Sequence, residues 1–202
     1  MTPTTSPTTP ERILATLDGL DPLGDLPRTG WLLRGINPCE SIAAHSLAVA
    51  LLTAMLCDAC RDAGLGVDGE LALRMALVHD APEARLGDVP MPVKTPALDA
   101  ALGVAEARLA AELLTPALVE AWQVAEAGET VEARLVKAAD KLQMLHKLWC
   151  YERAGRRHPL MEVMWANPAN LRSLDLAPVR AVYAALFARA GRPMPTPSPP
   201  AP

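Results

Sequence analysis

The chain has 202 residues, of which 50% are hydrophobic and only 3% aromatic, and its formal net charge is -4 at pH 7. This length corresponds to about one domain, and the acidic balance argues against general attraction to nucleic acid, which requires a basic face. With few aromatic side chains, the core must be filled by Ala, Leu, Val and Met, which suit closely packed helices. We therefore expect an all-α, single-domain protein that does not bind nucleic acid.

The predicted helices follow one another along the chain with short breaks, and no segment of useful length has the period of a strand. Residues 41–63 are rich in Ala and Leu, begin at a plausible N-cap, Ser41, and end at the glycine-containing break AGLGVDG. A helix over residues 69–79 ends where Pro82 interrupts backbone hydrogen bonding. The other helices are expected over residues 11–20, 97–114, 116–127, 129 or 130–154, and 175–190.

Both ends of the chain are rich in Pro, Thr and Ser, so we expect disordered tails over residues 1–10 and 193–202 around a domain of residues 11–192. No uninterrupted apolar stretch approaches the roughly 20 residues of a membrane span, and the start, MTPTTSPTTP, lacks a secretory-signal pattern. The four cysteines have no disulfide-framework spacing. Cys57 and Cys60 form a CxxC inside a predicted helix and are interpreted as buried thiols. These features favour a cytoplasmic protein without membrane association.

Ionisable side chains interrupt apolar helical sequence at three places. His79 and Asp80 end LALRMALVHD, Asp140 lies in the middle of a predicted long helix, and His45 lies in the Ala-rich segment ESIAAHSLAVALL. Buried ionisable groups need a partner, and a cation provides one. Each place also has an ordinary explanation: a hydrogen-bonded core histidine, a solvated helix end, or an aspartate paired with a flanking lysine.

Together, His45, His79, Asp80 and Asp140 supply two imidazoles and two carboxylates, a mixed set that suits divalent Mn, Co, Zn, Fe or Mg. Their order, H…HD…D with HDxxE and a following GDxPxPVK, resembles the HD-domain metal-dependent phosphohydrolases. The segments ESIAAHSLAVA, HDAPEARLGDVPMPVK and VKAADKL resemble the 5'-deoxynucleotidase branch in particular, over roughly residues 27–155. The resemblance implies an HD-type helical bundle in which these four residues bind one divalent metal ion.

The resemblance also assigns Glu83 and Asp88 to water activation and proton transfer. Glu83 stands one helical turn beyond His79 and can reach a water beside the metal without being a ligand. The ordinary explanations are an exposed helix-end carboxylate and a turn aspartate. The implied reaction is in-line attack of a metal-activated water on a (deoxy)nucleoside 5'-monophosphate, which releases phosphate. One carboxyl should protonate the leaving oxygen, and the sequence does not say which.

Substrate contacts are expected from the irregular stretch before His45. Arg28, Arg34 and Lys94 are candidate phosphate contacts, although exposed arginines are common. Trp31 is a candidate substrate contact, with an ordinary core position as the alternative. In the bacterial enzymes of the resembling branch an Arg directly precedes a Trp, whereas RTGW here looks more like the eukaryotic and archaeal members. The resemblance therefore leaves selectivity for deoxyribose open.

Two alternative functions remain. One is an HD phosphohydrolase for a nucleoside triphosphate, a cyclic nucleotide or a modified nucleotide, and the other is a non-catalytic nucleotide-binding helical module with a structural metal. The presence of Glu83 and Asp88 argues against the second, because a structural ion needs neither. Apolar faces in residues 97–127 and 175–190, and the dimers common among the resembling enzymes, predict a homodimer. His146 and His158 match no ligand position and receive no role.

Overall fold

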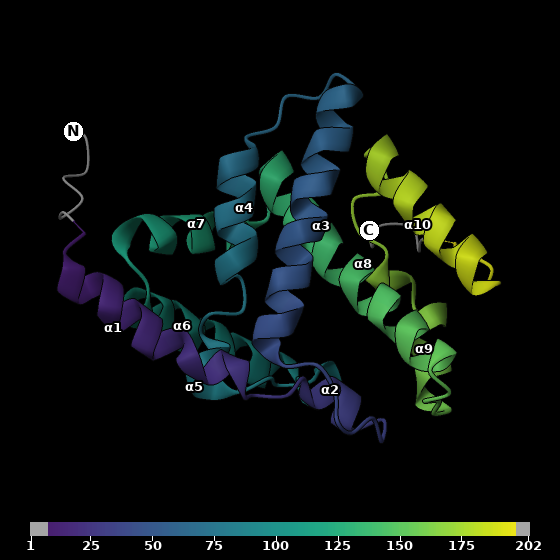
Figure 1. Ribbon diagram of the computed structural model, residues 1–202, viewed down its shortest axis with the longest axis horizontal. Helices are drawn as coiled ribbons and strands as arrows, with labels where there is room; N and C mark the ends of the chain where they lie inside the picture. The colour runs from purple at the N-terminus through teal and green to yellow at the C-terminus, as the bar shows by residue number, and fades with distance from the viewer. Residues whose placement is uncertain (1–7, 197–202) are drawn as a thin grey trace.

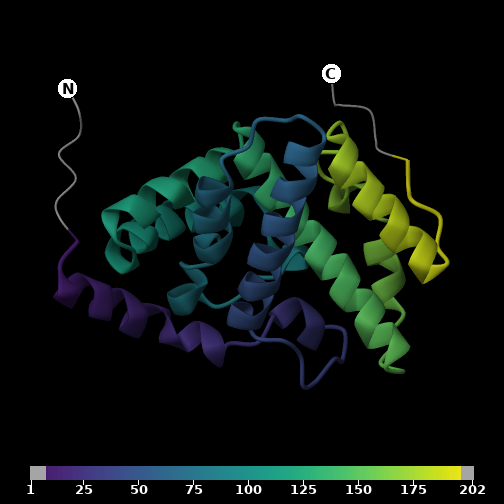
Figure 2. The same cartoon turned by 45° about the horizontal axis from the view of Figure 1, so that its top comes forward.

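A computed structural model describes residues 8–196, which fold into helices packed around α3 (Ile42–Asp62) (Figure 1). Helix α3 packs against α4 (Gly69–Val78), α8 (Val131–Arg153) and α10 (Ala177–Ala190). Both views place α7 (Pro116–Ala127) and α10 on opposite sides of α3 (Figure 2). The other helical elements are α1 (Pro10–Leu20), η1 (Asp21–Gly24), α2 (Thr29–Leu32), α5 (Glu83–Leu86), η2 (Met91–Val93), α6 (Pro96–Leu113), α9 (Leu160–Ala166) and η3 (Pro168–Asn170).

The all-α prediction is confirmed, because β pairing among residues 8–196 amounts to one isolated bridge between Pro27 and Ser41. The long helices begin and end within about two residues of their predicted bounds, which is the ordinary uncertainty of a helix end. The sequence reading missed α2, α5, α9 and the three short 3-10 turns. These elements are too short to show a hydrophobic period, and four of them, α2 and the three 3-10 turns, contain proline or glycine.

Side-chain caps fix the first turns of the three helices that carry the predicted metal ligands. Ser41, Asp68 and Thr130 accept hydrogen bonds from backbone N–H groups three residues later, at 3.2, 3.0 and 3.2 Å, at the starts of α3, α4 and α8. Each cap satisfies a donor that has no partner within the helix and so defines where the helix starts. The helix start in turn sets which side chains face the core.

Helix α3 is long and apolar enough to cross a membrane by length and composition alone, with a mean hydropathy of 1.7 over its most apolar window. From the sequence, no segment was expected to meet this standard. The core helix of a globular protein has the same composition, so one such helix is weak evidence of a span. Val49 and Leu56 of α3 are buried between neighbouring helices, as in a core helix.

The tails expected over residues 1–10 and 193–202 lie mostly outside the described residues. In the described part, the Thr9 hydroxyl caps α1, and Pro10 is the first residue of that helix. At the other end, Met194 packs partly buried against the main core. The disordered tails and the domain bounds of residues 11–192 stay predictions, since most of the tail residues lie outside the described part of the chain.

Candidate metal centre and adjoining cavity

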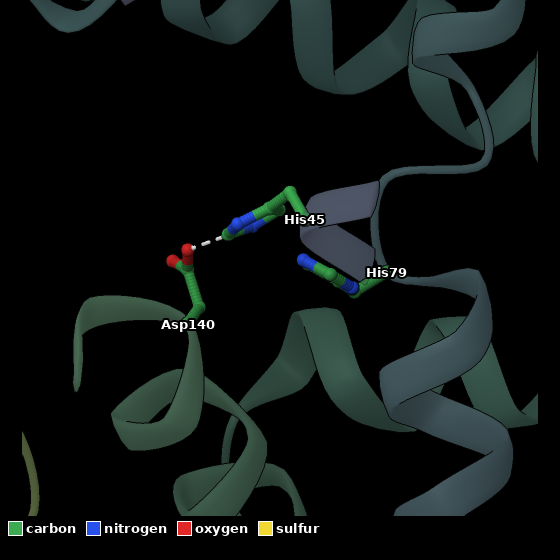
Figure 3. Close-up of side chains that lie close together, drawn as sticks. All are labelled: His45, His79 and Asp140. Carbon is green, nitrogen blue, oxygen red and sulfur yellow. Dashed lines mark ion pairs between the residues drawn. The ribbon is translucent and has the colours of Figure 1, made fainter. Parts of the chain in front are cut away.

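Three helices bring His45, His79 and Asp140 together, with one nitrogen or oxygen atom from each lying within 4.8 Å of the others (Figure 3). The Nε2 atom of His45 is 3.3 Å from Oδ1 of Asp140. Asp80 adjoins this group, since its Oδ2 atom is 3.6 Å from His45 Nε2 and 3.3 Å from His79 Nε2. All four predicted ligands therefore meet at one place.

The end of α4 explains how two adjacent residues reach the same point. His79 is the C-cap of α4, and the chain then turns through Asp80 and Ala81 until α5 begins at Glu83. Pro82 has no backbone N–H and so cannot continue the hydrogen bonding of α4. In a continuous helix, adjacent side chains point about 100° apart, and the turn lets both converge.

Hydrogen bonds fix the orientation of both imidazoles. Nδ1 of His45 is 2.6 Å from Oε1 of Gln143, and Nδ1 of His79 is 2.8 Å from the carbonyl oxygen of Ala76. Amide and carbonyl oxygens only accept hydrogen bonds, so each Nδ1 must carry the proton that it donates. In the neutral ring, each Nε2 therefore presents a lone pair toward the carboxylates of Asp80 and Asp140.

The Nε2 atoms of His45 and His79 are buried, and neither has a hydrogen-bond partner among the described residues. Each Nε2 lone pair lies 3.3 Å from a carboxylate oxygen, so two hydrogen-bond acceptors face each other with no donor between them, which is unfavourable in a buried site. A divalent cation satisfies both kinds of atom at once, and two imidazoles with carboxylates are ordinary ligands for first-row transition metals. The residues present therefore fit a metal ion, as the sequence predicted.

A buried polar network behind His45 was missed by the sequence reading. Gln143 uses Oε1 for His45 and donates from Nε2 to Oε2 of Glu40 at 3.0 Å, while Trp31 Nε1 donates to Oε1 of Glu40 at 2.9 Å. The hydroxyl of Tyr151 accepts a hydrogen bond from the backbone N–H of Glu40 at 2.9 Å. Such outer partners orient a metal-binding histidine. For Gln143 the available signal was a polar residue in the apolar run of α8 between Leu142 and Leu145, whereas Glu40 lies among exposed and half-buried residues and gives no such signal.

Charges around the centre keep two carboxylates ionised. Burial alone would raise the pKa of Asp140. The positive charge of Lys141, whose Nζ is 2.9 Å from Oδ2, and the contact with His45 have a larger opposite effect, so the pKa of Asp140 lies well below the usual range. Burial likewise raises the pKa of Asp80, and the stronger combined effect of His79, Arg28 and His45 lowers it. Both side chains are thus poised as anionic ligands.

Glu83 behaves in the opposite way. Burial and the nearby negative charge of Asp80 raise its pKa to about 9, although Arg28 opposes the shift. Its Oε2 atom is buried without a hydrogen-bond partner in the described part of the chain, and it lies 3.9 Å from Nη1 of Arg28. Glu83 is therefore a protonated carboxyl beside the centre at neutral pH in the metal-free protein.

The centre opens into a cavity of about 580 Å³, within the range typical of small-molecule sites. Gly87, at φ 71°, ends α5 in a backbone conformation that L residues rarely adopt, and the chain turns there into Asp88. Oδ2 of Asp88 accepts a hydrogen bond from the backbone N–H of Gly30 at 3.2 Å. Both predicted catalytic carboxyls, Glu83 and Asp88, line this cavity.

All four predicted substrate residues line the same cavity. Nη1 of Arg28 is 3.0 Å from Oδ2 of Asp80, and surrounding carboxylates outweigh burial to raise the pKa of this guanidinium. Arg34 donates to the carbonyl oxygen of Gly30 at 2.6 Å, and Lys94 lies 3.8 Å from Asp99.

Of the two alternatives for Trp31, the structure shows the core position, and the substrate contact stays a prediction. Trp31 is 3% exposed, packs edge-on against Tyr151 with ring centroids 5.2 Å apart, and also forms part of the cavity wall. Its indole N–H is already used by Glu40, so the face it presents to the cavity is the apolar ring. Trp31 therefore offers the cavity an apolar surface and no free hydrogen-bond donor.

The sequence profile of the HD domain family, described as "HD domain", matches residues 20–171. The chain belongs to the HD domain family. All four predicted ligands of this HD domain fall within the matched residues, so the resemblance expected from the motifs is confirmed. The chain is also 31% identical over 170 residues to the 5'-deoxynucleotidase hdd1 of Schizosaccharomyces pombe. The aligned region covers 77% of this chain and 80% of that relative.

Solved structures resemble this HD domain over most of its length. A conserved hypothetical protein from Pyrococcus furiosus superposes with a TM-score of 0.74 at 29% identity, covering 89% of this chain and 99% of that one. The HD phosphohydrolase DatZ of cyanophage S-2L, bound to dA and one catalytic Zn²⁺ ion, superposes with a TM-score of 0.59 at 26% identity, covering 86% and 95%. The HD-type helical bundle is thereby confirmed.

Proposed function

We propose that this HD domain protein is a metal-dependent phosphomonoesterase that releases phosphate from (deoxy)nucleoside 5'-monophosphates. The observation that carries the proposal is the pair of buried Nε2 atoms of His45 and His79, directed at Asp80 and Asp140 beside a cavity of about 580 Å³. The 5'-deoxynucleotidase relatives and the dA-bound HD phosphohydrolase support the nucleotide as substrate.

The cationic side chains at the mouth of the centre suit a phosphate. Arg28 stays charged at any working pH, because neighbouring carboxylates raise its pKa despite burial, and a guanidinium offers a fork of donors to phosphate oxygens. Lys94 and Arg34 line the same cavity and add positive charge. These residues neutralise and orient the substrate before the P–O bond breaks.

His45, His79, Asp80 and Asp140 would hold one divalent cation. Such an ion supplies Lewis acidity, which lowers the pKa of water and offsets charge on phosphate oxygens. Its identity among Mn, Co, Fe, Zn and Mg is left to experiment, since a mixed imidazole and carboxylate set accepts several of them. Buried Gln143 holds His45 in the tautomer that this binding requires.

Glu83 and Asp88 divide the proton transfers between them. In the metal-free protein, burial and Asp80 raise the pKa of Glu83 to about 9, which makes Glu83 the carboxyl suited to carry a proton. A protonated carboxyl can donate to the leaving ester oxygen, a step that a poor leaving group needs. Asp88, oriented by the N–H of Gly30, supplies an acceptor for the attacking water. We therefore assign the acid to Glu83 and the water-orienting role to Asp88.

A screen of released phosphate, pyrophosphate and triphosphate tests this function. The substrates are ribo- and deoxynucleoside mono- and triphosphates and a cyclic nucleotide, each assayed with Mn, Co, Mg, Zn and chelator. We expect phosphate from the monophosphates and only with metal, whereas dominant triphosphate release from dNTPs would overturn the proposal.

The Glu83→Gln variant tests the chemistry within the same screen. It should lose at least about 100-fold in kcat while its metal content is unchanged, and the surface variant Glu112→Gln on α6 is the matched control. Wild-type turnover by Glu83→Gln with metal bound would overturn the role of Glu83, whereas metal and nucleotide binding without any turnover by the wild type would favour the non-catalytic module.

We propose further that the protein forms a homodimer through α3 and α4. Leu47, Leu51 and Met55 recur every four residues on α3 and are 60%, 59% and 60% exposed. Leu73 and Leu77 add exposed apolar area on the adjacent helix α4. A second copy placed across a twofold axis covers the same patch on both chains at once.

This surface differs from the faces expected from sequence. The apolar side chains Val179, Tyr183, Leu186 and Phe187 of α10 are buried in the chain's own core and leave little for a partner. Sedimentation should give a dimer mass for the wild type and for the α1 control Leu17→Glu, and a monomer mass for Leu51→Glu. A monomeric wild type at micromolar concentration would contradict the dimer.

A cytoplasmic location is also part of this proposal, supported by the four free cysteines.

A further inference from the structure

The wall of the cavity that lies beyond the metal ligands has no role in the phosphate chemistry above. It is formed by α8, α9 and the residues of η3, and includes Met144, Met164, Asn167 and Asn170. None of these residues belongs to the motifs that predicted the centre. Their chemistry, two thioethers and two amides, differs from the charged groups around the metal site.

Helix α8 connects this wall to the metal centre. Asp140 and Met144 are four residues apart on α8 and both line the cavity, so their backbones are separated by about 6 Å along the helix axis. Helix α9 packs against α8 and brings Met164 to the same wall. Met144, Asn167 and Asn170 thus line the same cavity as Asp140, so a ligand with its phosphate at the metal centre has them within the same space.

Internal hydrogen bonds fix which way each amide points. Nδ2 of Asn170 donates to the carbonyl oxygen of Met164 at 2.7 Å, and Oδ1 of Asn167 accepts from the backbone N–H of Ala169 at 3.0 Å. A carbonyl only accepts and an N–H only donates, so neither amide can be reversed without losing its bond. Asn170 keeps its side-chain oxygen and its second N–H for a ligand, and Asn167 keeps its whole NH2 group as a donor beside one free lone pair.

A donor beside an acceptor matches the polar edge of a nucleobase, which also carries donors next to acceptors. The faces of a base are aromatic, and methionine sulfur makes favourable contacts with aromatic rings. Met164 is 9% exposed and Met144 is half-buried, so both are held by packing and present a defined apolar surface. Trp31 lines the same cavity and adds a further apolar surface.

We propose that Asn167 and Asn170, together with Met144 and Met164, form the subsite for the nucleobase. This inference deepens the proposed nucleotidase function and rests on it. The amides hydrogen-bond the edge of the base while the thioethers pack against its face. The same wall should contribute nothing to a sugar phosphate that lacks a base.

Asn167→Asp provides the sharpest test, because the aspartate keeps the oxygen that accepts from Ala169 and loses only the donor. Its kcat/KM should fall about 10-fold for dAMP, dCMP, dGMP and dTMP and stay within about twofold for 2-deoxyribose 5-phosphate. The base-free ester carries the same phosphate, so it corrects for the added negative charge. Ala166→Asp adds that charge one position away and should change neither class selectively.

Asn170→Ala removes the acceptor and should give the same selective loss, with thermal unfolding used to confirm that the variant is folded. Equal losses for nucleotides and for the base-free ester in both Asn variants would overturn the subsite. Calorimetric Kd values for dAMP and 2-deoxyribose 5-phosphate provide a readout that does not require turnover. A wild type that hydrolyses neither ester would overturn the proposed function, while a Kd difference between the ligands that Asn167→Asp abolishes would still support the subsite.

Discussion

His45 and Gln143 are 98 positions apart in the chain, yet Nδ1 of the imidazole lies 2.6 Å from Oε1 of the amide in the buried core. Gln143 is itself held by Glu40, whose Oε2 accepts from Nε2 at 3.0 Å. Because the amide oxygen can only accept, this contact places the proton on Nδ1 and leaves Nε2 to bind a cation. We therefore expect the affinity of the centre for metal to depend on Gln143, which is not one of the predicted ligands.

Gln143→Leu should weaken metal binding about 10- to 100-fold, because the leucine cannot accept the proton of His45 Nδ1 and the ring loses its fixed orientation. Calorimetric titration of the chelator-treated protein with Mn²⁺ measures the effect directly. Gln123→Leu, an exposed substitution on α7, is the control. A Kd for Gln143→Leu within twofold of the wild type would show that the network is only structural.

Asp140→Asn should abolish metal-dependent turnover, with a loss of at least about 100-fold in kcat/KM and a matching loss of bound metal. The amide keeps the size of the side chain but removes the charge that Lys141 and His45 now stabilise. Elemental analysis and phosphate release are measured on the same sample. Asp58→Asn, on the exposed face of α3 in a surface pair with Arg61, should leave both values unchanged. Full metal content in Asp140→Asn would remove Asp140 from the ligand set.

Glu83→Gln should alter how the stability of the chelated protein depends on pH. The pKa of Glu83 is raised from its ordinary 4.5 to about 9, so between these values the folded state holds a proton that the unfolded chain has released. The associated stability is full below about pH 4.5 and is lost as the pH rises through about 9. The glutamine stays neutral, so Tm at pH 9 should exceed that of the wild type by at least about 4 °C, with little difference at pH 4.5. Parallel melting curves at both pH values would contradict the raised pKa.

Arg28→Met should destabilise the chelated protein more than the metal-loaded protein. Arg28 is the cation nearest Asp80, with Nη1 3.0 Å from Oδ2, and both side chains are largely buried. Removing one partner leaves a buried charge without compensation, which costs about 3 kcal/mol or more, whereas a divalent cation at the centre supplies that compensation. Thermal melts with EDTA and with Mn²⁺ measure the difference. Arg74→Met, which breaks an exposed pair on α4, should show no such dependence on metal.

Most of the fold was predictable because the long helices are indicated by local sequence signals, namely hydrophobic periodicity, N-cap residues and prolines. Ser41 caps α3 as predicted, α8 begins at Val131 within two residues of its predicted start, and Pro82 follows the end of α4. By contrast, α9 and η3 were missed because neither is long enough to show a hydrophobic period. That gap hid Asn167 and Asn170, since nothing local indicates that the end of α9 lies against the cavity.

The sequence by itself determined the chemical types of the centre: two imidazoles and two carboxylates placed within apolar helical sequence, where burial without a partner is too costly to be accidental. Only the tertiary structure decided what each group does. The tautomer of His45 depends on Gln143, and the protonation of Glu83 depends on Asp80 and on burial. Both are set by distances between groups on different segments and by the exclusion of water, which packing alone creates.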